Sequence, residues 1–214
     1  MLGEATSVSA IVFDLDGTLY TNAELLAEIE RTAELLVARG RGVSPQAARR
    51  TMNRARRRIA DLEGREPTLS RVCMELGIEL RDLHRTFEEM VRPEQYLVYD
   101  PVLQALLEGL REHCPLYLYT NNNLLLTQKI LALLGIENLF ERLFTIEYAW
   151  RPKPDPEVLE MVLGEIGGPP DEVLFVGDRD QVDLEPARER GLPTLLVSET
   201  ADLLQVHKLL GLLP

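Results

Sequence analysis

Short apolar runs alternate with helical segments over most of this chain, and this alternation most constrains its fold. The first run covers residues 10–13, and it reads as a buried strand. Beyond residue 100, the pattern predicts further strands separated by helices, at residues 116–119, 143–146, 173–176 and 194–197. Such alternation indicates a parallel sheet with helices on both faces. We therefore predict an α/β fold with a doubly wound, Rossmann-like sheet, whose last two helices cover about 184–190 and 201–210.

Residues 20–95 interrupt this pattern with helical periodicity and no convincing strand. The first helix there should end at Gly40 and Gly42, and the second should begin at Ser44-Pro45. The second helix should bury one stripe of side chains, which consists of Ala48, Met52, Ala55, Ile59 and Leu62. We predict a bundle of about four helices over 20–95, inserted into a core formed by 1–19 and 96–214.

The charge of the chain is unevenly distributed. The whole chain has a formal net charge of −12, which argues against nucleic acid as a partner. Residues 20–95 are nearly neutral, with 14 Arg and no Lys against 13 acidic residues. Either the arginines form ordinary solvated helix faces, which is the simpler interpretation, or a near-neutral insert covers an acidic, metal-binding body.

No apolar run reaches the length of about 18 residues that a membrane span needs. The first nine residues do not resemble a secretory signal. Cys73 and Cys114 are isolated, which favours buried thiols over a disulfide or a metal site. We therefore expect a cytoplasmic protein without a membrane partner, present as a monomer or homodimer.

Polar residues follow four of the five predicted strands. They are Asp14 and Asp16, Thr120 and Asn121, Lys153, and Asp178 with Asp180 and Asp183 behind it. Because ligands bind at the carboxyl ends of strands in such folds, we expect these side chains to converge at one edge of the sheet. Two carboxylates at the end of a buried strand are costly unless a charge compensates them, and a hard cation is the natural partner.

With these motifs in this order, the chain resembles the haloacid-dehalogenase-like (HAD) hydrolase superfamily. The matching signatures are Asp14-Leu15-Asp16-Gly17-Thr18, Thr120-Asn121, Lys153-Pro154, and Gly177-Asp178 with Asp183. They span nearly the whole chain, and the helical insert resembles the helical cap of this family.

The resemblance implies a phosphatase that uses an aspartyl-phosphate intermediate. Asp14 would be the nucleophile, and Asp16 would protonate the leaving oxygen and then activate water. Mg²⁺ would be held by the Asp14 carboxylate, the Asp16 backbone carbonyl and the Asp178 carboxylate. The substrate would be a small phosphorylated metabolite.

The remaining signature residues have supporting roles in the same resemblance. Lys153 would offset negative charge, while Thr120 and the backbone N–H groups near Asn121 would bind phosphate oxygens. Asp183 would support the metal site or orient Lys153. Gly17 permits a close backbone approach, and Thr18 would brace the loop.

Several alternatives stay open at this point. Dehalogenating relatives lack an acid at the position of Asp16, so phosphoryl transfer is favoured over dehalogenation. A phosphomutase would use the same core residues, and a non-enzymatic phosphoacceptor or regulatory protein would use a similar acidic pair.

The substrate itself is not fixed by these motifs. The layout resembles phosphoglycolate phosphatases, and the Leu19-Tyr20 sequence resembles pyrimidine nucleotidase-like members. Tyr20 begins the insert and could face the cleft. Arg179 stands where many relatives have Ser or Thr. Asp180 is an alternative to Asp183 as the acid that supports the metal site or orients Lys153. No role follows for His84, His113 or His207.

Overall fold

The sheet consists of five parallel strands in the order β3-β2-β1-β4-β5. A computed structural model describes residues 8–212, so the ends of the predicted core (1–7 and 213–214) lie outside the described residues. The strands are β1 (Ala10–Phe13), β2 (Leu116–Tyr119), β3 (Arg142–Phe144), β4 (Val173–Gly177) and β5 (Thr194–Leu196). The predicted α/β fold with a doubly wound sheet is therefore confirmed.

The third strand ends earlier than predicted. The N–H group of Ile146 donates to the carbonyl oxygen of Asn122 at 3.0 Å instead of pairing along the strand. The prediction of a strand over 143–146 was therefore wrong at its carboxyl end, because the N–H group of Ile146 bonds to the loop residue Asn122 and not to a neighbouring strand.

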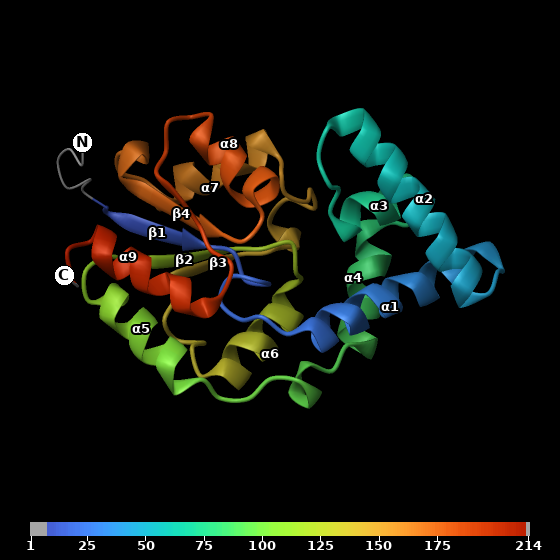
Figure 1. Cartoon of the computed structure of the whole chain (residues 1–214), viewed down its shortest axis with the longest axis horizontal. Coiled ribbons are helices and arrows are strands. Elements are labelled where there is room, and N and C mark those ends of the chain that lie inside the picture. Colours follow the sequence, from blue (N-terminus) through green and yellow to red (C-terminus); the bar gives the residue numbers. More distant parts are fainter. Residues whose placement is uncertain (1–7, 213–214) are drawn as a thin grey trace.

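Alternate residues of β1 face opposite sides of the sheet. Ile11 and Phe13 pack in the core on the side of α5 (Pro101–Arg111), α6 (Leu124–Leu134) and α9 (Leu204–Leu209). Ala10 and Val12 pack on the side of α7 (Pro156–Ile166) and α8 (Glu185–Arg188). Figure 1 shows these two helical layers below and above the sheet.

The last two helices are shorter than predicted. After α8, the N–H groups of Arg190 and Gly191 bond three residues back, so the helix tightens into a turn before 190. Before α9, the N–H group of Asp202 bonds to Glu199 in the same way. The residues after α8 and the residues before α9 therefore form tight turns, where the apolar periodicity predicted continuous helix.

Four helices occupy the insert, as predicted: α1 (Ala23–Arg41), α2 (Pro45–Glu63), α3 (Leu69–Glu75) and α4 (Leu80–Met90). The Ser44 side chain caps α2 ahead of Pro45. Gly40 lies inside α1, whereas Gly42 ends it in the left-handed conformation with a φ of 62°. Figure 1 shows α1 to α4 gathered beside one end of the sheet.

The buried stripe of α2 differs from the prediction at one position. Met52 and Ile59 are buried, but Leu62 is 79% exposed. In this last turn Glu63 pairs with Arg71 of α3 at 3.0 Å, which leaves the neighbouring Leu62 side chain turned to solvent. The prediction that Leu62 belongs to the inner face was therefore wrong.

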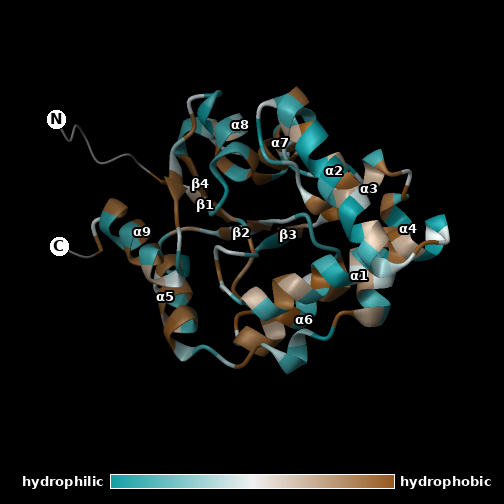
Figure 2. Cartoon of the chain, turned by 45° about the vertical axis from the view of Figure 1, so that its right-hand side comes forward, coloured by the Kyte–Doolittle hydropathy of each residue, from teal (hydrophilic) through white to brown (hydrophobic). Residues whose placement is uncertain are grey.

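The helices are amphipathic, and none within residues 8–212 is long and apolar enough to cross a membrane. Figure 2 shows much of α2 as hydrophilic, consistent with its many arginines. Apolar burial against α1 and α3 therefore holds this helix in place.

The two apolar residues near the end of α2 should differ in their contribution to stability. Ile59→Ala should lower the free energy of unfolding by about 2–5 kcal/mol, since Ile59 is 1% exposed and its truncation leaves a cavity. Leu62→Ala is the matched control and should change it by less than about 0.5 kcal/mol. Urea unfolding followed by circular dichroism measures both; equal losses would contradict this packing.

Candidate active site

The centre of the sheet brings two aspartates together. The chain runs outward from β1 to β3 and then returns to place β4 on the other side of β1, so the strand order reverses between β1 and β4. Asp14 follows β1 and Asp178 follows β4, and the N–H group of Asp14 donates to the carbonyl oxygen of Val176 at 2.9 Å. A crevice at such a reversal is the usual ligand site of this architecture.

Lys153 lies at the bottom of this crevice and is 3% exposed. Its Nζ atom donates to Asp14 Oδ1 at 2.7 Å, to Asp183 Oδ1 at 2.7 Å and to the carbonyl oxygen of Tyr119 at 2.8 Å. Burial would lower the pKa of Lys153, but the charges of Asp14 and Asp183 raise it above its ordinary value. The lysine is therefore a permanent cation that joins the ends of β1 and β2 to the segment that follows β4.

Asp14 is subject to opposing influences. Burial, followed by the charge of Asp183, raises its pKa, whereas the charge of Lys153 lowers it. The short contact with Lys153 favours the ionised carboxylate. Thr18 Oγ1 also lies 3.4 Å from Asp14 Oδ2, a long donor contact that braces the same loop.

Asn121 holds the loop that carries Lys153. Its side chain accepts from the Lys153 N–H group at 2.7 Å and donates to the Lys153 carbonyl oxygen at 3.3 Å. Thr120 is buried, and its hydroxyl accepts from the N–H group of Asn122 at 3.1 Å. The Thr120 hydroxyl proton stays available for an incoming acceptor just before α6.

Asp16 is held by two residues to which the sequence analysis assigned no such role. The Tyr20 hydroxyl donates to Asp16 Oδ1, and Asn122 Nδ2 donates to Asp16 Oδ2 at 2.7 Å. Burial, and then the charge of Asp14, raises the pKa of Asp16 to about 6, while the Tyr20 hydrogen bond opposes this rise. The sequence placed Tyr20 where it could face the cleft, and its position four residues after Asp16 on the same loop explains the contact.

The choice between Asp180 and Asp183 follows from their partners. Asp180 forms a two-pronged ion pair with Arg188 at 2.8 Å on the surface. Asp183 is buried, binds Lys153 and accepts from the Arg179 N–H group at 3.0 Å. The structure therefore places Asp183 against the site and directs Asp180 away from it.

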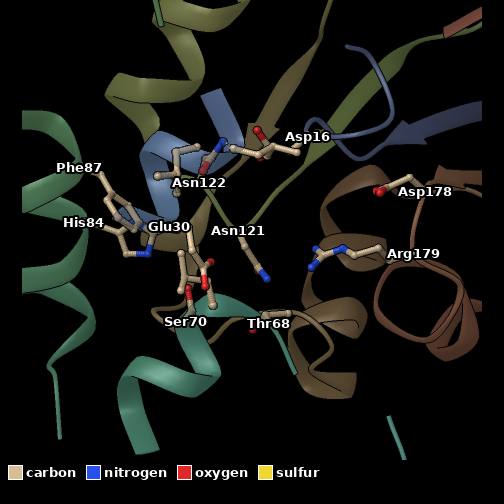
Figure 3. Close-up of a pocket in the computed structure, with 13 residues that line it drawn as sticks. Asp16, Glu30, Thr68, Ser70, His84, Phe87, Asn121, Asn122, Asp178 and Arg179 are labelled. Carbon is tan, nitrogen blue, oxygen red and sulfur yellow. The ribbon is translucent and has the colours of Figure 1, made fainter. Parts of the chain in front are cut away.

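A pocket of about 250 Å³ opens above these residues, between the sheet and the helical insert. Figure 3 shows Asp178 and Arg179 on one side and His84 and Phe87 of α4 on the other, with Asp16 between them. Of the residues predicted after the strands, Asp16, Asn121 and Asp178 therefore line this pocket.

A model of the haloacid dehalogenase-like hydrolase family matches residues 8–191 of the chain. This match covers most of the sequence and includes every residue of the site described above.

The chain belongs to the haloacid dehalogenase-like hydrolases.

Two relatives of this hydrolase are named phosphatases. The chain is 28% identical over 193 residues to the phosphoglycolate phosphatase of Pectobacterium atrosepticum. This alignment covers 89% of this chain and 80% of the relative. It is also 28% identical over 196 residues to pyrophosphatase PpaX of Bacillus velezensis, which covers 90% of this chain and 84% of the relative.

The fold of the hydrolase also matches solved structures. The HAD phosphatase from Thermococcus onnurineus superposes with a TM-score of 0.62 at 20% identity, over 95% of this chain and 98% of the other. At this level of identity the similarity bears on the fold alone, and it agrees with the α/β architecture.

The acidic residues of the hydrolase fit a bound cation. Carboxylate oxygens of Asp14, Asp178 and Asp183 lie within 4.8 Å of one another. Within residues 8–212, buried Asp178 Oδ1 has no hydrogen-bond partner, whereas both oxygens of Asp183 have one. Of the three carboxylates, Asp178 therefore has the oxygen that is free to bind a hard cation.

The loop of Gly17 shows how tightly this acidic site is enclosed. A Cβ atom on Gly17, whose φ is +88°, would lie 2.4 Å from Asp178 Oδ2. Burial, followed by the charges of Asp14 and Asp183, raises the pKa of Asp178 to about 7. An added positive charge would relieve this repulsion, so the site favours a cation.

A divalent cation should stabilise this hydrolase in a pH-dependent manner. Mg²⁺ should raise the melting temperature clearly at pH 8 and little at pH 5.5, because protons compete for Asp178 below about pH 7. Ionisation of Asp178 destabilises the cation-free fold as pH rises from its unfolded pKa toward 7. Asp178→Asn should therefore raise the melting temperature without Mg²⁺ at pH 8 and remove the response to Mg²⁺.

Asp180→Asn is the matched control for this thermal measurement, because Asp180 pairs with Arg188 at the surface. It should keep the full response to Mg²⁺. An Asp178→Asn protein that Mg²⁺ stabilises as strongly as the wild type would rule out Asp178 as a ligand.

Proposed function

We propose that this hydrolase is a Mg²⁺-dependent phosphatase that releases phosphate from a small phosphorylated metabolite through an aspartyl-phosphate on Asp14. One observation carries the proposal: of two aspartates on a single loop, one contacts a cation and the other contacts neutral hydrogen-bond donors. Asp14 contacts the Lys153 ammonium at 2.7 Å, and Asp16 has a neutral hydrogen-bonding environment formed by Tyr20 and Asn122. Such a difference separates a nucleophile from an acid.

Asp14 acts first in the proposed reaction. A carboxylate oxygen of Asp14 attacks phosphorus, and the bond from phosphorus to the leaving oxygen breaks. The Lys153 charge reduces repulsion between the Asp14 carboxylate and the substrate phosphate, while the Thr120 hydroxyl and the backbone N–H groups near Asn121 bind phosphate oxygens. These groups are fixed before substrate arrives, so little reorganisation is needed.

Asp16 moves the protons in both halves of the reaction. Its carboxyl proton passes to the leaving oxygen. The resulting carboxylate then takes a proton from water, whose oxygen attacks phosphorus as the bond to Asp14 breaks. A pKa of about 6 suits a group that must both give and take a proton near neutral pH.

The Asp14 and Asp178 carboxylates, together with the Asp16 backbone carbonyl, would hold Mg²⁺. When bound, this ion supplies positive charge that stabilises the phosphate oxygens as their charge shifts. Asp183 positions Lys153 in this proposal, which the contact of 2.7 Å between them supports.

We also propose that residues 20–95 act as a cap over the catalytic part of the chain formed by 1–19 and 96–214. The pocket supports this division, because its walls come from α1, α3 and α4 on one side and from the strand ends on the other. The relatives named phosphoglycolate phosphatase and pyrophosphatase support a small phosphorylated substrate.

Replacing either aspartate should separate the two chemical roles. Asp14→Asn should lower kcat for phenyl phosphate by roughly 10⁴-fold or more, since the amide cannot act as the nucleophile. Asp16→Asn should lower it by about 10²–10⁴-fold and should accumulate a phosphorylated protein, detectable by mass spectrometry. Asp180→Asn should keep wild-type rates. Undiminished turnover by Asp14→Asn would contradict the nucleophile.

Removing the Tyr20 hydroxyl should change the pH dependence. The pH profile of kcat/KM should fall as pH rises through the pKa of Asp16, because the first step requires its protonated form. Tyr20→Phe removes a hydrogen bond that lowers this pKa, so the falling limb should move to higher pH. Tyr96→Phe, which loses a similar contact with Glu28 outside the site, should leave the limb in place. An unshifted limb in Tyr20→Phe would contradict this role.

A further inference from the structure

His84 of α4 is a buried polar side chain that the fold leaves unsatisfied. It is 2% exposed, and neither ring nitrogen has a hydrogen-bond partner within residues 8–212. A buried polar group without a partner costs stability, so its retention needs an explanation. The ring lines the pocket, and Figure 3 shows it directed toward the space between Phe87 and Glu30.

The His84 ring is neutral and fixed in place. Burial lowers its pKa to about 4, so near neutral pH it offers one N–H donor and one nitrogen acceptor. Its ring meets Phe87 edge-on with 5.4 Å between centroids. Its backbone carbonyl accepts from Asn123 Nδ2 at 3.2 Å, which ties α4 to the start of α6. The ring is therefore held at a constant position relative to the catalytic residues.

The insert residues that line the pocket beside His84 include no cation. The pocket residues from the insert are apolar, hydroxylic or acidic: Leu26, Ile29, Glu30, Thr68, Leu69, Ser70, His84 and Phe87. Glu30 is already paired with Arg56. The pocket's guanidinium, on Arg179, lies on the opposite side next to Asp178. A second anionic group on the substrate would therefore find no unpaired cation among the insert residues that line this end of the pocket.

From this arrangement we propose that His84 binds a hydroxyl group of an uncharged leaving group, so that the substrates are phosphate esters of small polyols or sugars and not of carboxylated alcohols. This inference rests on the proposed phosphatase function. A hydroxyl can accept from the N–H nitrogen of a neutral imidazole or donate to its other nitrogen, so it suits whichever nitrogen it meets, whereas a carboxylate can only accept. The volume of about 250 Å³ suits a small substrate.

Three substrates test the proposal with Mg²⁺ present: glycerol 1-phosphate, phosphoglycolate and phenyl phosphate. The wild type should have a kcat/KM at least tenfold higher for glycerol 1-phosphate than for phosphoglycolate. A preference for phosphoglycolate, or equal values, would overturn the inference and leave the phosphatase function standing. No phosphate release from any of the three would overturn the proposed function, and the inference with it.

Variants of His84 show whether this residue causes the preference. His84→Leu should lower kcat/KM for glycerol 1-phosphate by about threefold to tenfold more than for phenyl phosphate, which has no hydroxyl on its ring. His84→Asn, which keeps a donor and an acceptor, should restore part of the ratio. His113→Leu, at an exposed histidine, is the control and should leave the ratio unchanged.

Thermal unfolding separates this role from a structural one. His84→Leu should melt at the same or a higher temperature than the wild type, because it removes an unsatisfied polar group from a buried position. A lower melting temperature together with equal losses for glycerol 1-phosphate and phenyl phosphate would assign His84 to packing and overturn the inference.

Discussion

The buried ammonium group of Lys153 is the interaction on which the rest of the site depends. Asp14 and Asp183 are both buried, and their carboxylates share the Lys153 ammonium as hydrogen-bond donor and counter-charge. The same ammonium binds the carbonyl oxygen at the end of β2, so one charge connects the ends of β1 and β2 with the segment after β4. Removing one partner of such a buried group leaves an uncompensated charge, which is far costlier than losing a surface pair.

Much of this site was predictable because its residues directly follow strands or lie in the loops after them. Apolar runs identified the strands, and parallel topology requires their carboxyl ends to meet. Asp14, Lys153 and Asp178 were found in this way, and the structure brings them together. The family resemblance added chemical roles that spacing alone does not give.

What the sequence did not reveal depends on contacts between segments. Asn122 reaches Asp16 across 106 residues, and no local pattern encodes that pairing. His84 looked like one of three scattered histidines because its burial depends on how α4 packs. Leu62 fitted the helical period of α2, yet periodicity does not indicate where a neighbouring helix stops.

The arginines of the insert do more than form solvated surfaces. Arg49 pairs with Glu34 and Arg56 with Glu30, which joins α2 to α1, and Arg58 pairs with Glu75 of α3. Each exposed pair contributes little by itself. Their shared effect is to neutralise the insert, so the excess negative charge remains with the part of the chain that contains the acidic site.

Asn123 has a consequence for the movement of α4 relative to the sheet. Its side chain begins α6 by accepting from Leu126 and also donates to the backbone of α4, while being completely buried. Any swing of α4 away from the sheet must break this amide contact and expose it to water. The residue that caps α6 thus also sets a free-energy cost on separating α4 from the sheet, through a hydrogen bond that is independent of the cap itself.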